Sequence, residues 1–178
     1  MPRLNTTTRN LAENSEEVSF GPIPAGKYIA RLSKVEAKQS QAGNPFWSCE
    51  YDQVHMLDGT PAPGRLWYTL NLPMDGPAPA GYTPRNPNRP PAEAWESRQN
   101  IAASRLKGWF HAHGFTLDSD TDEMVGTVAM LTVVQETIQR GQRAGQIGNQ
   151  VTNVEAAPEG ADAVPQSPWD AKFANDAF

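Results

Sequence analysis

The sequence has few of the features that secreted, membrane-spanning or zinc-binding proteins need. It contains a single cysteine, Cys49, among 178 residues, which excludes a disulfide framework and a multi-cysteine zinc site. No stretch approaches the roughly 18 consecutive apolar residues of a membrane span. Residues 1–10 are polar and lack the apolar run of a signal peptide. We therefore expect a soluble, cytoplasmic protein that does not bind a membrane.

Bulky apolar residues are also scarce, because Leu, Ile, Val and Phe make up 31 of the 178 residues. This share is below the roughly 20% that marks a fully packed chain. The formal net charge of −5 is too small to predict disorder throughout, so we expect one small core with unstructured ends. The chain is not basic overall, and a nucleic-acid site would have to come from local placement of cations.

Composition divides the chain into three parts. Residues 1–17 hold few apolar side chains and are expected to form a flexible leader. Residues 18–155 carry the patterned apolar residues of a folded domain, within which the proline-rich segment 73–95 is expected to be a loop. Residues 156–178 are rich in Ala, Pro and acids and cannot bury enough apolar surface to offset the entropy of ordering. They are predicted to be a disordered acidic tail.

The domain contains five segments with the alternation or the Val and Thr content of β-strands: 26–37, 46–55, 65–72, 127–137 and 149–155. In the first of these, Val35 and Ala37 lie one residue out of phase with Tyr28, Ala30 and Leu32, which predicts a β-bulge.

One helix is predicted between the third and fourth strands, over about 97–113. Its apolar face is formed by Ala102, Leu106, Trp109, Phe110 and His113, and Gly114 would end it. Five strands curled into a partly closed barrel, with a helix at one end, form the OB architecture. We therefore predict a mainly β, OB-like barrel, with an open α+β sheet as the alternative.

Catalytic chemistry finds little support in the residues present. Cys49 alternates along its strand with Glu50 and Asp52, and acidic neighbours raise the pKa of a thiol rather than activate it. Cys49 is therefore interpreted as a core residue.

Metal binding is equally weakly supported. The segment 118–122 resembles the start of a calcium loop, but Glu123 stands where that loop needs glycine. The histidines His111 and His113 point to different faces of the predicted helix. We therefore expect a protein that is not an enzyme and that binds no metal or cofactor. The weaker alternative is a magnesium-dependent nuclease that uses the acids of 118–123.

Cations interleaved with aromatic residues favour nucleic acid, since a groove for single strands needs cations along the phosphates and flat rings that stack on bases. Trp67 shares a strand face with Arg65 and is the best stacking candidate. Ordinary core aromatics and a solvated basic face would explain the same composition. The candidate nucleic-acid-binding residues are Lys27, Arg31, Lys34, Lys38, Trp47, Arg65, Trp67, Arg140 and Arg143.

Two further segments have alternative interpretations. The proline-rich loop is either a floppy insertion or a clamp in which Tyr82, Arg85 and Arg89 hold a strand. The tail is either a solubility tag or a mimic of a nucleic-acid strand that lies in the empty groove and docks onto partner proteins. Its candidate partner-binding residues are Trp169, Asp170, Phe173, Asp176 and Phe178.

The chain contains the short motifs FGPIPAGKY at 20–28, KVEAK at 34–38, AGNPFW at 42–47, GRLW at 64–67 and RLKGW at 105–109. These motifs resemble those of a phage family of small proteins, found in replication and recombination gene clusters, that are described as single-stranded-DNA-binding proteins with an OB-type fold. The tail is similar to those of bacterial and phage single-strand-binding proteins, although it is less densely acidic and contains Lys172.

The resemblance implies a phage protein that coats and protects single-stranded DNA, without sequence specificity, in the cytoplasm of the infected host cell. It would hand the strand to a polymerase, recombinase or nuclease bound by the tail, and a homo-oligomer is left open. The alternative function is a structural or adaptor β-barrel protein that binds a protein partner and no nucleic acid.

Overall fold

The computed structural model describes residues 22–160. The predicted leader (1–17) and all five predicted partner-binding residues of the tail lie outside these residues. Within the described part of the chain, no helix combines the length and the hydropathy that crossing a membrane requires.

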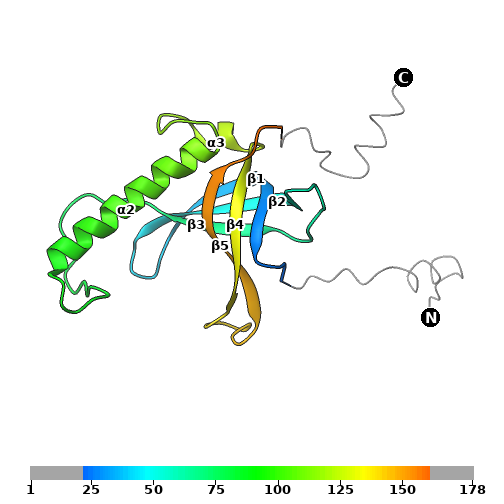
Figure 1. Cartoon of the computed structure of the whole chain (residues 1–178). Helices are drawn as coiled ribbons and strands as arrows, with labels where there is room; N and C mark the ends of the chain where they lie inside the picture. Colours follow the sequence, from blue (N-terminus) through cyan, green and yellow to red (C-terminus); the bar gives the residue numbers. More distant parts are fainter. Residues whose placement is uncertain (1–21, 161–178) are drawn as a thin grey trace, which may run out of the picture.

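Five antiparallel strands form a single sheet in the order β3-β2-β1-β4-β5 (Figure 1). The edge strands β3 and β5 contact each other, but no ladder of hydrogen bonds joins them among residues 22–160. The sheet is therefore open, and the predicted closure into a barrel is not confirmed. The strands are β1 (Gly26–Gln39), β2 (Pro45–Met56), β3 (Leu66–Asn71), β4 (Val128–Thr137) and β5 (Ile147–Ala156).

A β-bulge in β1 confirms the phase slip seen in the sequence. Leu32 pairs with Tyr51 of β2, and the next paired residue of β1 is Lys34, opposite Glu50. The intervening residue, Ser33, is left out of the register with β2, although its hydroxyl donates a 3.0 Å hydrogen bond to the Glu50 carbonyl. Because side chains alternate between faces along a strand, this extra residue brings Lys34 to the same outward face as Arg31.

The long helix α2 (Pro91–Ala112) and the short α3 (Thr121–Met124) connect β3 to β4. Helix α2 begins six residues before the predicted start, since proline is tolerated at the first helical position, where its missing N–H would have no partner. Trp109 and Phe110 pack into the sheet's hydrophobic core from the C-terminal half of the helix. The N-terminal half extends beyond the sheet, beside the β3–α2 loop (Figure 1).

A chain of buried hydrogen bonds ties the end of α2 to the sheet. Trp109 Nε1 donates to the Tyr51 hydroxyl over 2.9 Å, and that hydroxyl lies 2.9 Å from His113 Nε2. His113 Nδ1 lies 2.9 Å from the hydroxyl of Thr127, which donates to the Met124 carbonyl. These directions require a neutral His113 with its proton on Nδ1, and burial lowers the pKa of this imidazole to about 4.

The interpretation of Cys49 as a core residue is confirmed. Its side chain is fully buried, and burial raises the pKa of the thiol to about 12.

Candidate nucleic-acid interface

The start of β3 and the β4–β5 hairpin enclose an open cavity of about 390 Å³, which we call the hairpin trough. Trp67 contributes to it from β3, Arg65 contributes from the position just before this strand, and Arg143 contributes from the hairpin loop. Trp67 is 56% exposed, an unusual state for a tryptophan in a folded domain. The trough therefore brings together two cations and one accessible indole that were predicted from segments about 75 residues apart.

The local structure explains why these side chains meet. Leu66 and Leu70 are buried, so the period of two along β3 turns Trp67 outward. At the base of the hairpin, the Asn149 side chain accepts a hydrogen bond from Ile23 N and donates one to Ile23 O, each 2.8 Å long. These bonds fix the segment before β1 against the hairpin and form one wall of the trough.

The predicted sheet cations lie on the outward face, but carboxylates already contact them. Arg31 donates two hydrogen bonds to Asp52, of 3.0 and 2.9 Å, and these raise the pKa of its guanidinium. Arg65 donates to Glu50 from the neighbouring strand. A phosphate group would have to displace carboxylates from these residues in order to bind.

The lysines of β1 are paired in the same way. Glu36 lies 2.6 Å from the Lys34 ammonium and 3.4 Å from that of Lys38, and both lysines lower the pKa of its carboxyl. Lys27, at the beginning of β1, contacts Glu155 of β5 over 3.0 Å. Such exposed ion pairs contribute little stability, and a competing anion can exchange with them.

Two of the predicted residues differ from the rest in their placement. Trp47 faces inward and is partly buried, with its ring edge-on to those of Trp109 and Phe110 at 5.9 and 6.2 Å between centroids. It belongs to the core side of the sheet rather than to the surface that carries Trp67. Arg140 is exposed in the hairpin loop with Arg143, but does not line the trough.

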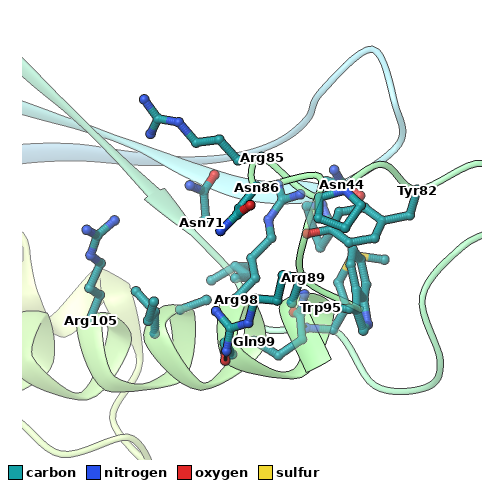
Figure 2. A pocket seen from close by; sticks show the side chains of 18 residues that line it. Asn44, Asn71, Tyr82, Arg85, Asn86, Arg89, Trp95, Arg98, Gln99 and Arg105 are labelled. Carbon is teal, nitrogen blue, oxygen red and sulfur yellow. Dashed lines mark hydrogen bonds between the residues drawn. The ribbon is translucent and has the colours of Figure 1, made fainter. Parts of the chain in front are cut away.

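A second, larger cavity of about 480 Å³ was anticipated only in part, because the sequence analysis named Tyr82, Arg85 and Arg89 of its lining as a possible clamp but not the helix residues. It lies between the β3–α2 loop, the part of α2 from Ala94 to Arg105 and the end of β3 (Figure 2), and we call it the arginine cleft. The loop contributes Arg85 and Arg89, and the helix contributes Arg98 and Arg105. Arg98 and Arg105 are seven residues apart, a spacing that places two side chains on one face of a helix. That signal was available in the sequence.

Metal-dependent chemistry finds no site in the described part of the chain. No group of three or more His, Cys, Asp or Glu side chains is arranged there to hold a metal ion. The acidic segment around Asp120 instead begins α3, where the Asp120 carboxylate accepts a 3.0 Å hydrogen bond from Asp122 N.

Comparisons with known proteins do not assign the chain to a family. No protein-family model and no curated protein matches it, so the resemblance to the phage family stays a prediction. Among solved structures, yeast RPA bound to single-stranded DNA aligns with 100% of this chain and 99% of the yeast chain, at a TM-score of 0.33 and 11% identity. A score this low does not assign a fold, and the function must be argued from the side chains themselves.

Proposed function

We propose that the protein binds single-stranded DNA in the hairpin trough and along the outward face of β1–β3. The observation that carries this proposal is the exposed Trp67, which lines a cavity open to solvent together with Arg65 and Arg143. An indole held in this way can stack on any base, because every base has a flat π-face, while the guanidinium groups contact phosphates. Binding of this kind is independent of sequence.

The remaining predicted cations would follow the strand away from the trough. Arg31, Lys34 and Lys38 lie on the outward face beyond Trp67, and Arg140 extends the basic surface of the hairpin. Phosphates would replace the carboxylates that pair with Arg31, Lys34 and Lys38. Lys27, next to Glu155, would mark the far side of the interface.

The proposed biological role follows from such binding. The protein would coat exposed strands in phage replication or recombination and would make or break no covalent bond. The fold would act as an OB-like module whose edge strands β3 and β5 flank the bound strand. The tail would dock a polymerase, recombinase or nuclease through its acidic and aromatic residues.

The test is a titration of fluorescently labelled oligo-dT, 20 nucleotides long, measured by anisotropy at low salt. The variant Trp67→Ala should raise the Kd by about 5- to 150-fold, which corresponds to the roughly 1–3 kcal/mol that one stacked base contributes. The matched control is Leu117→Ala, which removes a side chain that is 54% exposed and lies outside the trough. It should leave the Kd within twofold.

Two results would contradict the proposal. The first is an unchanged Kd for Trp67→Ala, and the second is no binding by the wild-type protein at low salt. Capture of a protein partner without any oligonucleotide binding would favour the adaptor function instead.

A further inference from the structure

The arginine cleft concentrates positive charge without local compensation. Four arginines line it, and no Asp or Glu does. Among residues 22–160, none of the four forms an ion pair with a carboxylate, whereas Arg65 and every predicted cation of β1 do. A concave surface lined by one sign of charge focuses the field and attracts a counter-ion. The cleft is therefore a ready site for an anion.

The loop that forms one side of the cleft is held against the helix. Trp95 is 5% exposed, its Nε1 donates to the Gly76 carbonyl over 3.2 Å, and Tyr82 packs edge-on against its ring at 5.0 Å. Gln99 accepts a 2.7 Å hydrogen bond from Met74 N. These contacts, together with the many prolines of the loop, make the cleft largely preformed, so a ligand loses little entropy in ordering it.

Two of the arginines are themselves fixed by this packing. Arg89 donates a 2.6 Å hydrogen bond to the Ser97 hydroxyl, and the Arg98 guanidinium lies 5.8 Å from the centre of the Trp95 ring. Arg85 and Arg105 are exposed and make no such contact among the described residues. The cleft thus presents two positioned and two adaptable guanidinium groups.

The chemistry of the lining favours a phosphate backbone with bases attached. Guanidinium groups match phosphate oxygens with two parallel hydrogen bonds. Side-chain amides lie among the arginines and can pair with base edges, as Figure 2 shows for Asn44, Asn71 and Asn86. The volume of about 480 Å³ lies in the range of pockets for small organic ligands.

Strand β3 runs continuously from the proposed interface to the cleft. Trp67, Thr69 and Asn71 share the outward face of this strand, with Trp67 beside the trough and Asn71 lining the cleft. Four residues of a strand cover about 14 Å, a span that a few nucleotides can bridge. This continuity favours a nucleic-acid strand over an acidic peptide as the occupant.

We propose that the arginine cleft binds the phosphates of a single-stranded nucleic acid and extends the DNA interface along β3 to helix α2. This inference rests on the proposed function. It assigns a role to the β3–α2 loop and makes Arg85 and Arg105 the phosphate contacts that can be removed without disturbing the packing of the loop.

The test uses the full-length chain and the double variant Arg85→Gln/Arg105→Gln. Anisotropy titrations with oligo-dT of 20 nucleotides at about 50 mM salt should show a Kd raised about tenfold or more. Across a salt series, the slope of log K against log salt should become shallower by about 1.4, because two phosphate contacts each contribute about 0.7. The single variants Arg105→Gln and Lys107→Gln are compared as a matched pair. Lys107→Gln is the control, because Lys107 is an exposed cation on the same helix but outside the cleft.

The inference is overturned if the double variant affects the Kd no more than Lys107→Gln does, while its urea midpoint equals that of the wild type. A loss of affinity in Trp67→Ala alongside that result would leave the proposed function intact. No binding of oligo-dT by the wild type would remove both proposals. A synthetic peptide of residues 155–178 tests whether the cleft binds an acidic peptide instead of DNA. If the double variant weakens binding of the peptide but not of DNA, the cleft is an acidic-peptide site and the inference is wrong.

Discussion

Protonation of His113 should destabilise the fold in mild acid. Burial lowers the pKa of this imidazole to about 4 in the folded state, against 6.5 for an ordinary histidine. Between these two pH values the unfolded chain binds a proton that the folded chain does not. The free energy of unfolding must therefore fall as the pH is lowered, by about 1.4 kcal/mol per pH unit and about 3 kcal/mol in total.

The hydrogen-bond chain explains why the folded state resists this proton. His113 Nε2 accepts from the Tyr51 hydroxyl, and that hydroxyl is already the acceptor for Trp109 Nε1. A protonated Nε2 would turn a second donor toward the same oxygen. Water cannot relieve this conflict easily, because the His113 side chain is only 6% exposed. Protonation of His113 therefore lowers the free energy of unfolding whether or not a ligand is bound.

Urea unfolding at several pH values between 7 and 4, followed by circular dichroism, measures this effect. The wild type should lose about 3 kcal/mol more than His113→Gln over this range, because glutamine does not titrate. His111→Gln, which removes an exposed histidine from the last turn of the same helix, should retain the wild-type pH dependence. A constant difference between the wild type and His113→Gln across this range would refute the argument.

Three further outcomes are expected. Glu50→Gln should lower the Kd for oligo-dT about threefold at low salt by freeing Arg65, since a negative charge about 6 Å from a phosphate in water costs about 0.7 kcal/mol. An unchanged Kd in anisotropy titrations would count against binding on the outward face. Tyr51→Phe should lower the free energy of unfolding by about 2–4 kcal/mol, because two buried ring nitrogens lose their partner, and a loss below 1 kcal/mol in urea unfolding would argue against the network. Cys49 should react with a thiol reagent only as fast as the protein unfolds, and rapid labelling of the native state would contradict its burial.

The strands and the helix could be predicted because their burial follows simple periods. Leu66 and Leu70 alternate with exposed residues on β3, and Trp109 and Phe110 follow the helical spacing that places them in the core. The bulge in β1 was visible as a change of phase at Val35, since one extra residue reverses the face of every later side chain.

The ion pairs and the way in which loop and helix together line the cleft could not be predicted, because they depend on contacts between distant segments. Arg65 meets Glu50 only in the observed register of β2 and β3. The arginine cleft forms only after Tyr82 of the loop packs on Trp95 of the helix. Closure of the sheet likewise depends on hydrogen bonds between its two edge strands, which the alternation within each strand does not determine.

Intrinsic tryptophan fluorescence, recorded while oligo-dT is added, tests the stacking of a base on Trp67 most directly. Trp67 is the exposed indole of the described residues, since Trp95 and Trp109 are 5% and 1% exposed and Trp47 is partly buried. Oligo-dT should quench the wild-type protein. In Trp67→Phe the quenching should largely disappear while anisotropy still reports binding, because a phenyl ring can stack in place of the indole. Equal quenching in the two proteins would contradict the account.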